Sequence, residues 1–256
     1  MLQSQRQEKI LNFLTYNDYL ELSNAVELFD ASPATINRDF NDLADKKLVQ
    51  RVRGGIRPLK KQDGMLPFAF RELQYSKEKE KLAQKAATMI NPGDVVFVDG
   101  GTTTFHLGMS MPDLRFHIIT NSLRLATLLE EKAAEQPGIE VSLTGGYLHK
   151  QSGILLGPNT RASLEQYNAH WAFISVGGIT ENGIFNTNEL VTETERAMIR
   201  NAEKTVILAD HSKIGKLALC HVANLNEIDI LITNTNPDND KKLDQYREAG
   251  ITVITV

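Results

Sequence analysis

Seven apolar runs rich in β-branched residues, all beyond residue 90, most constrain the fold of this chain. Turn residues bound each run, and helical patterns separate most of them. Such runs are typical of strands buried on both faces, which arise where helices cover a parallel sheet. The sequence therefore predicts an α/β domain with a mainly parallel sheet. The runs are DVVFVD, FHIIT, EVSLTGG, HWAFISVGG, TVILAD, IDILITN and ITVITV.

Glycine and polar clusters follow four of these runs, where ligands of parallel sheets bind. The first cluster, DGGTTT, opens a helical pattern. Glycines there let the backbone approach an anion, while threonine hydroxyls and helix-start N–H groups donate to it. One cluster alone could be an ordinary turn with threonine caps, but four at strand ends favour a shared ligand crevice. The candidate ligand contacts are Asp99, Gly101, Thr102, Thr103, Thr104, Thr120, Asn121, Ser122, Gly145, Gly146 and Gly177.

Three charged positions join this candidate site. Lys213 follows the run TVILAD and could neutralise a phosphate or carboxylate, although a surface lysine fits equally well. Glu189 and Glu193 lie near the start of the helical pattern ELVTETERAMIRNA. An acid in a first helical turn could contact the ligand or complement the helix dipole. Both interpretations stay open at this point.

Three short helical patterns precede residue 45. The first spans about residues 4–15 and the second about residues 22–29. The third begins at Ser32-Pro33, where serine can cap free N–H groups and proline tolerates the first helical position. Only Asp30 and Ala31 separate the second and third helices. So short a connection makes the helices cross steeply, as in a helix-turn-helix.

The third helix and the segment after it carry groups suited to DNA. Opposite the apolar stripe of this helix lie short or fork-shaped polar groups, of which arginine can bind guanine bidentately and asparagine adenine. The segment LVQRVRGGI alternates apolar and basic residues and then turns on glycine, which predicts a two-stranded wing facing phosphates. The predicted DNA contacts are Ser32, Ala34, Thr35, Asn37, Arg38, Asn41, Arg51 and Arg53.

Charge supports the same interpretation without deciding it. The chain has a net charge of −4, yet residues 43–61 hold seven Lys or Arg and one acid, Asp45. A basic run is often only a solvated face, and trihelical modules also bind proteins. The tight turn, the capped helix and the basic wing together favour double-stranded DNA. Asp39 is expected to serve the helix or anchor the wing, because phosphates repel a carboxylate.

These patterns divide the chain into three parts. Residues 1–58 are predicted to form a small α+β winged helix-turn-helix domain, and residues 76–256 the α/β domain. Residues 59–75 carry Pro67, Gly64 and many charged residues without a clear period, which indicates a linker. A helical turn is expected at 68–73, and its two phenylalanines suggest that the linker docks on a folded part.

The motifs resemble one known family. SPATINRDFNDL followed by LVQRVRGG is similar to the DNA-binding signature of DeoR-type regulators. DGGTTT, TNS, TGG, GG and ADHSK, in this order, resemble their C-terminal sensor domain, whose fold is similar to ribose-5-phosphate isomerase, glucosamine-6-phosphate deaminase and CoA transferases. Asn37 stands where the family usually has an arginine, and Gly100 where it has a serine. The resemblance implies a sugar-phosphate effector, with the threonine loop at the phosphate and Lys213 and one acid near the sugar.

The leading hypothesis is a repressor of a carbohydrate-catabolism operon, controlled by that phosphorylated sugar. A homodimer or homotetramer is expected, because one module covers too little DNA and paired half-sites remedy this. One alternative is an isomerase or deaminase with an added module, although no acid and base stand at an informative spacing. Another is an architectural DNA-binding protein whose second domain only dimerises.

Composition limits the remaining possibilities. The six histidines show no metal-site spacing, and one cysteine can form neither a structural zinc site nor an internal disulfide. No run of eighteen apolar residues occurs, and the first residues lack the apolar core of a secretory signal. We therefore expect no metal, no cofactor, no membrane association and a cytoplasmic location.

Overall fold

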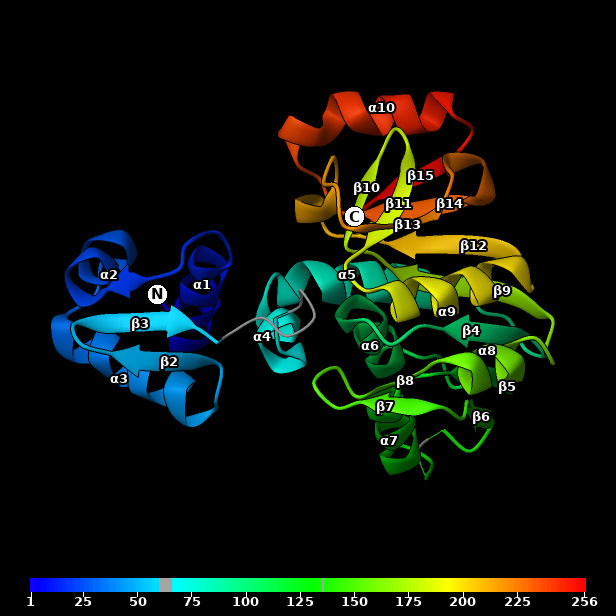
Figure 1. Ribbon diagram of the computed structural model, residues 1–256, viewed down its shortest axis with the longest axis horizontal. Helices are drawn as coiled ribbons and strands as arrows, with labels where there is room; N and C mark the ends of the chain where they lie inside the picture. Colours follow the sequence, from blue (N-terminus) through cyan, green and yellow to red (C-terminus); the bar gives the residue numbers. More distant parts are fainter. Residues whose placement is uncertain (60–65, 135) are drawn as a thin grey trace. The chain divides into compact units, whose positions relative to one another are not determined.

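In the computed structural model the chain divides after Ser76 into two units, Met1–Ser76 and Lys77–Val256 (Figure 1). The structure describes residues 1–59, 66–134 and 136–256. The division falls at the end of the segment predicted as a linker, of which residues 60–65 lie outside the described residues.

The N-terminal unit follows the predicted helix-turn-helix closely. Asp30 ends the second helix in the left-handed conformation, with φ of 46°, and Ser32 caps the third. The Ser32 Oγ accepts a hydrogen bond from the Thr35 N–H at 3.2 Å. The two-residue turn is thus fixed from both sides. The elements of this unit are α1 (Gln3–Tyr16), β1 (Leu20–Glu21), α2 (Leu22–Phe29), α3 (Pro33–Asp45), β2 (Val49–Val52), β3 (Gly55–Pro58) and α4 (Phe68–Leu73).

The wing has one strand more than the sequence predicts. β2 and β3 pair antiparallel as expected, but β1 also pairs antiparallel with β3, giving the order β1-β3-β2. The predicted two-stranded wing is therefore present as the β2–β3 hairpin, and β1 extends it to a three-stranded sheet that the sequence did not predict. Gly55 allows this pairing, because a Cβ at that position would lie 2.2 Å from the Leu20 carbonyl oxygen. The third strand ties the wing to the start of α2.

The segment predicted as a linker belongs in part to the N-terminal unit. Leu66 and Phe70 are buried in the same hydrophobic cluster as the helices of that unit. The Gln74 side chain donates a hydrogen bond to the Leu11 carbonyl at 3.4 Å, and the Ser76 N–H donates to Glu8 at 3.2 Å. The expected helical turn is α4, and one of its phenylalanines, Phe70, provides the expected docking.

The C-terminal unit is built on a seven-stranded, fully parallel sheet that contains all seven predicted runs. Its order is β15-β14-β12-β9-β4-β5-β6. From β4 the chain winds outward through β5 and β6, and from β9 it winds the other way. The strand order therefore reverses between β4 and β9. The strands are β4 (Val95–Val98), β5 (Phe116–Thr120), β6 (Ile139–Leu143), β9 (Ala169–Ser175), β12 (Ala202–Leu208), β14 (Ile230–Thr233) and β15 (Thr252–Thr255).

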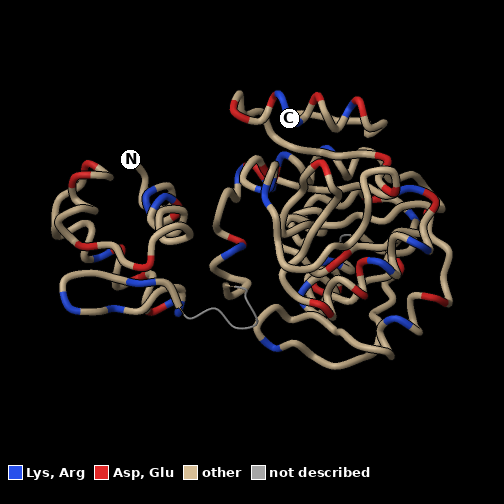
Figure 2. Tube along the Cα trace, turned by 45° about the horizontal axis from the view of Figure 1, so that its top comes forward, with Lys and Arg blue, Asp and Glu red and all other residues tan. Residues whose placement is uncertain are grey.

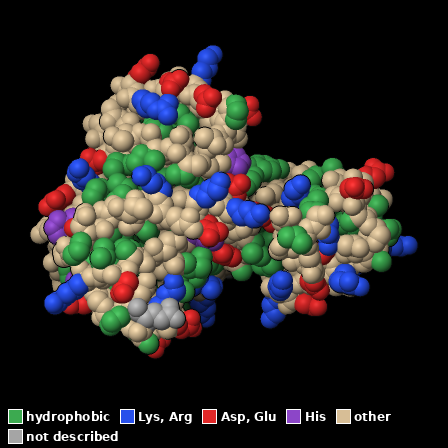
Figure 3. Space-filling view, turned by 180° about the vertical axis from the view of Figure 1, so that it is seen from behind, with side chains coloured by type: hydrophobic (Ala, Val, Ile, Leu, Met, Phe, Trp, Pro, Cys, Tyr) green, Lys and Arg blue, Asp and Glu red, His purple; other side chains and the backbone are tan. Residues whose placement is uncertain are grey.

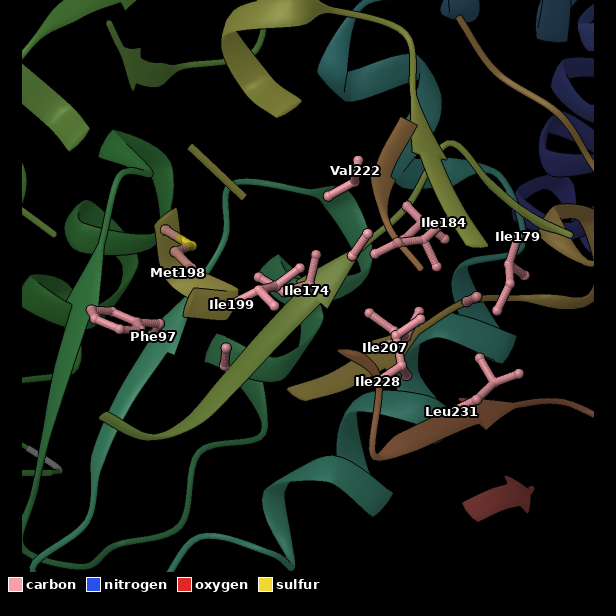
Figure 4. Close-up of a cluster of buried hydrophobic side chains, with 14 of the residues drawn as sticks. Phe97, Ile174, Ile179, Ile184, Met198, Ile199, Ile207, Val222, Ile228 and Leu231 are labelled. Carbon is pink, nitrogen blue, oxygen red and sulfur yellow. The ribbon is translucent and has the colours of Figure 1, made fainter. Parts of the chain in front are cut away.

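Helices cover both faces of this sheet (Figure 1). Successive residues of β4 show this, because Phe97 belongs to one hydrophobic cluster while Val96 and Val98 belong to another. Figure 4 shows the first cluster, where Phe97 and Ile174 of the sheet lie near Met198 and Ile199. The helices are α5 (Ser76–Ala87), α6 (Thr102–Met109), α7 (Leu123–Glu131), α8 (Pro158–Leu164), α9 (Glu189–Arg200) and α10 (Asp240–Glu248), with short 3₁₀ turns at His211–Lys213, Leu225–Glu227 and Pro237–Asn239.

Five short strands add to the predicted set. β7 (Tyr147–His149) and β8 (Ile154–Leu156) form an antiparallel hairpin. β10 (Gly178–Thr180), β11 (Gly183–Asn186) and β13 (Cys220–Ala223) form a small antiparallel sheet. Both features follow carboxyl ends of the main strands, so they flank the edge where a ligand is expected. Within the described ranges, no helix is long and apolar enough to cross a membrane.

Candidate functional site

The exposed side of α3 is the candidate DNA-reading face. Ala34, Arg38 and Asn41 are exposed and Asn37 is half-buried, whereas Ile36 and Phe40 on the opposite side are fully buried. The spacing of the four outward residues follows the helical repeat, so they form one stripe. Figure 2 marks the Lys and Arg positions along both units. On the face shown in Figure 3, basic and acidic side chains are interspersed.

The first turn of α3 uses two predicted contact residues internally. The hydroxyls of Ser32 and Thr35 lie 2.8 Å apart and share a hydrogen bond, in addition to the capping hydrogen bond that Ser32 Oγ accepts from the Thr35 N–H. Ser32 remains exposed and Thr35 is half-buried. Their hydroxyls therefore shape the helix start while facing solvent.

The wing and α3 are joined by a polar bridge that sequence reasoning missed. Arg51 of β2 donates from Nη2 to Asn37 Oδ1 at 2.9 Å. The same guanidinium lies over the Phe40 ring, 5.3 Å from its centroid. Arg53, at the tip of the wing, is exposed. Two predicted DNA-contact residues, Asn37 and Arg51, thus form one unit.

Asp39 points away from the DNA-reading face, as predicted. It is 1% exposed and forms an ion pair with Arg6 of α1, whose Nε and Nη2 both donate to the carboxylate. The carboxylate therefore joins α1 to α3 within the helix bundle, and the alternative role of anchoring the wing is not what the structure shows.

The C-terminal unit gathers polar groups at the carboxyl edge of the sheet, where the strand order reverses. Asp99 follows β4, Ser175 ends β9, and the Ser175 hydroxyl donates to Asp99 Oδ2 at 2.9 Å. The Gly101 N–H donates to Asp99 Oδ1 at 3.3 Å. A Cβ at Gly101 would lie 1.6 Å from Ser175 Oγ, so only glycine permits this approach. In open α/β sheets such a reversal is the usual ligand position.

The threonine loop turns directly into α6 at this reversal. Thr102, Thr103 and Thr104 form the first turn of α6 and are buried, and the N-cap residue, Gly101, has no side chain that could cap their N–H groups. The Thr104 hydroxyl donates to the Gly101 carbonyl at 3.0 Å. Uncapped N–H groups at a helix start, with the positive end of the helix dipole, suit an anion.

The side chains of the second predicted cluster, residues 120–122, mainly form hydrogen bonds within the protein. The Thr120 hydroxyl donates to the Val98 carbonyl at 2.7 Å, and Ser122 caps α7 through the Leu125 N–H. Asn121 Nδ2 donates to the Leu155 carbonyl at 3.1 Å, which ties the β7–β8 hairpin to the sheet edge. Asn121 Oδ1 is buried and has no hydrogen-bond partner in the described structure.

The glycine clusters occupy two different places. Gly145 and Gly146 are exposed at the start of the β7–β8 hairpin, and Gly146 has a φ of 132°. Gly177 follows β9, where its N–H donates to the Phe185 carbonyl at 2.8 Å. Gly177 therefore lies beside the Asp99–Ser175 pair in the sheet order, whereas the other two lie beyond β6.

The acid that α9 places at this edge is Glu195, which sequence reasoning missed. Glu189 and Glu193 are exposed, but Glu195 is 1% exposed and accepts a hydrogen bond from Asn186 Nδ2 at 2.6 Å. Burial, reinforced by the negative charge of Asp99, raises the pKa of Glu195 well above its usual value. Burial likewise raises the pKa of Asp99. The available signal was a carboxylate on the apolar side of α9, one turn from Val191 and Met198.

After β12, Asp210 lies near Lys213, and its pKa is shifted in the opposite direction to those of Asp99 and Glu195. Burial alone would raise the pKa of Asp210, but the charges of Lys213 and Lys79, with hydrogen bonds from Ser212, lower it below the usual value. Lys213 is half-buried and Lys79 is buried. The buried carboxyls of this edge therefore lie in unlike environments, since the pKa of Asp210 is lowered while the pKa values of Asp99 and Glu195 are raised. Across the described ranges, no three His, Cys, Asp or Glu side chains group as a metal site would require.

Comparison with known proteins identifies the family. Residues 6–62 match the model of the DeoR-like helix-turn-helix domain, and residues 74–235 match that of the DeoR C-terminal sensor domain. The chain belongs to the DeoR family. Over its full length it is 32% identical to the HTH-type transcriptional regulator UlaR of Salmonella arizonae, which is also fully covered. It is 30% identical to the regulator YulB of Bacillus subtilis, with 93% of this chain and 91% of the relative covered.

The family settles the class of function. This DeoR-family chain is a DNA-binding transcriptional regulator with a sensor domain for a small-molecule effector, and the isomerase or deaminase alternative is set aside. Among solved structures, ribose 5-phosphate isomerase A from Methanocaldococcus jannaschii is similar, with a TM-score of 0.39, 19% identity and 54% of each chain covered. This similarity is too weak to indicate which ligand the sensor domain binds, so the ligand must be inferred from the residues of the sensor domain itself.

Proposed function

We propose that this regulator represses a carbohydrate-catabolism operon and that a phosphorylated sugar, bound at the carboxyl edge of the sensor sheet, controls its affinity for the operator. The observation that carries the proposal is the uncapped start of α6 at the point where the strand order reverses. The phosphate would bind the N–H and hydroxyl groups of the threonine loop. Lys213 would supply a positive charge, and Asp99 and Glu195 would accept or donate to sugar hydroxyls.

On the DNA side we assign the contacts to the exposed stripe of α3 and to the wing. Arg38 and Asn41 are exposed on α3, and Arg53 extends from the wing tip. In winged helix-turn-helix proteins such groups read base edges and hold phosphates, respectively. One module buries little DNA, so we propose a homodimer or homotetramer that binds paired half-sites in the cytoplasm.

Control requires that the effector bind one arrangement of the protein better than the other. A ligand that interacts equally with the DNA-competent and DNA-incompetent arrangements shifts nothing, however tightly it binds. We therefore expect the sugar phosphate to change operator affinity, with a matching change in sugar-phosphate affinity when DNA is bound.

Fluorescence anisotropy on labelled DNA from upstream of the regulator's own gene tests the proposal. The protein is titrated with and without aldose and ketose phosphates, and we expect one compound to change operator affinity at least about fivefold. Thr103→Val removes a hydroxyl from the threonine loop, so it should weaken that response while leaving operator binding unchanged. Thr252→Val, at an exposed position of β15, is the matched control. Operator binding that no sugar phosphate alters would refute the effector assignment alone.

A further inference from the structure

The bridge between Asn37 and Arg51 constrains what α3 can read on DNA. Asn37 lies in the outward stripe of α3, between Ala34 and Asn41, where a recognition helix meets base edges. An asparagine with a free amide favours adenine, since its oxygen accepts from the adenine N6 amino group while its nitrogen donates to N7. In this protein the amide oxygen already has a partner, because Arg51 Nη2 donates to Asn37 Oδ1 at 2.9 Å.

The chemistry of arginine fixes the direction of this amide. A guanidinium group has five N–H donors and no acceptor, so the atom facing it must be the amide oxygen. Rotating the amide would set its N–H groups against the guanidinium and lose the hydrogen bond. Asn37 therefore presents Nδ2, with its donors, on the side away from Arg51.

Phe40 holds the guanidinium in place. Its ring lies 5.3 Å from the Arg51 guanidinium carbon, within the range of a cation–π contact, and Phe40 is itself fully buried in the helix core. The β2 backbone below Arg51 is paired with Ile56 of β3. Arg51 is thus held by the helix through two contacts and by the wing through its strand, which favours one orientation before DNA arrives.

We infer that Arg51 is a positioning residue that makes Asn37 a donor-only reader, so that the base facing Asn37 is guanine or thymine and not adenine. Guanine N7 and O6 and thymine O4 are acceptors in the major groove, whereas adenine offers N7 beside an N6 donor that a donor-only group cannot satisfy. This inference rests on the assignment of α3 as the recognition helix. It differs from a phosphate-binding role for Arg51, which would carry no base preference.

Selection from a randomised duplex library, with sequencing of the bound fraction, tests the inference on the full-length protein. Asn37→Ala first identifies the base pair that Asn37 reads, as the position whose preference disappears. At that position the wild type should favour guanine or thymine over adenine. Arg51→Met keeps an aliphatic stem over Phe40 but removes the donors. It frees Asn37 Oδ1, so the affinity for adenine relative to guanine should rise roughly tenfold.

Arg53→Met is the matched control, because Arg53 is an exposed wing arginine in the same hairpin. Loss of a phosphate contact weakens binding to all sequences alike and reduces the salt slope by about 1. If Arg51→Met behaved in this way, with the base preference intact, Arg51 would be a phosphate contact and the inference would be overturned. A wild-type preference for adenine at the Asn37 position would overturn it without any Arg51 variant. Failure to enrich any sequence would contradict the assigned DNA-binding function itself.

Discussion

The two units present their polar side chains in opposite ways. On the outward side of α3, Arg38 and Asn41 are exposed, and the Asn37–Arg51 bridge is at the surface. At the carboxyl edge of the sensor sheet, Asp99, Glu195 and Asp210 are buried. DNA brings a large, rigid polyanionic surface that exposed groups can meet. A small ligand, in contrast, is bound by groups that exclude water around it.

This difference shows which unit must stabilise its functional groups before its ligand binds. Exposed recognition groups cost little in the absence of DNA. A buried carboxylate must be compensated by hydrogen bonds, by a cation or by a proton before any ligand binds. Asp210 has the cations, and Glu195 holds a proton more readily than an ordinary glutamate. Substitutions in the two units should therefore affect stability very differently.

The single tryptophan separates the two units in one experiment. Trp171 lies in β9 of the sensor sheet, with Nε1 donating to Asp94 Oδ2 at 3.1 Å. Its fluorescence reports unfolding of the C-terminal unit, whereas far-UV circular dichroism reports both units. Urea titrations of the full chain followed by both signals assign each change in unfolding free energy to one unit.

The largest effect is expected from Asp39→Ala, which tests whether the buried Arg6–Asp39 ion pair stabilises the N-terminal unit. The substitution leaves Arg6 without its carboxylate partner, which should lower the unfolding free energy of that unit by about 3 kcal/mol. The part of the circular dichroism change that comes from the N-terminal unit should shift to lower urea, and the fluorescence transition should not shift. Asp45→Ala, at an exposed position of the same helix, is the control. A shift no larger than that of the control would mean that the Arg6–Asp39 pair contributes little.

Gly101→Ala should be the next largest and should act only on the sensor unit. The added Cβ would overlap the Ser175 hydroxyl, so we expect a loss of about 2 kcal/mol in the fluorescence transition. Gly145→Ala is the control, because no atom lies within 4 Å of a Cβ placed there. Equal stability of the two variants would show that the β4–β9 junction tolerates an added methyl group.

The third prediction concerns pH and Glu195. Because burial raises the pKa of Glu195 in the folded state, the folded unit holds this proton more tightly than the unfolded chain. The resulting stability is complete below the ordinary glutamate pKa and is lost as pH rises through the raised pKa. As pH rises above the ordinary glutamate pKa, the fluorescence transition should therefore weaken, by about 1.4 kcal/mol for each pH unit of the pKa increase. Glu195→Gln should reduce this decline to the part that the raised pKa of Asp99 contributes, while exposed Glu203→Gln should keep it whole. A decline that persists unchanged in Glu195→Gln would have to come from other groups.

The smallest effect is the difference between two helix caps that are alike except in burial. Ser32 Oγ and Ser122 Oγ each accept a backbone hydrogen bond at 3.2 Å, but Ser32 is exposed and Ser122 is buried. Ser32→Ala lets water replace the cap and should cost about 1 kcal/mol. Ser122→Ala leaves a buried N–H without a partner and should cost about 2 kcal/mol. If Ser32→Ala and Ser122→Ala lowered the unfolding free energies of their units equally, burial would not explain the difference between the two units.

Elements with a strong local pattern were predictable from the sequence. The seven parallel strands came from β-branched runs, and the start of α3 came from Ser32-Pro33. The two-residue strand β1 has no periodicity, and β13 lies in an apolar run that gives no sign of its antiparallel pairing with β11. Such strands exist because tertiary contacts pair them, so sequence patterns miss them.

The candidate site likewise contains residues that the sequence could predict and residues that depend on tertiary packing. Asp99, the threonine loop and Lys213 stand directly after predicted strands, so topology alone brought them to one edge. Glu195 lies within α9, and whether it faces solvent or the sheet depends on how that helix docks. Asn37 and Arg51 were both expected to contact DNA, but their hydrogen bond joins residues 14 positions apart and depends on how the wing folds back.

The reversal of strand order between β4 and β9 bears on how such sensors can be redesigned. The place where a ligand is expected is set by the path of the backbone, before any side chain is chosen. Thr120 and Ser122 are committed to internal hydrogen bonds, whereas Gly145 and Glu189 are exposed. A biosensor engineer could therefore keep the sheet and its committed hydroxyls fixed and search for new ligands by varying the loops around the edge.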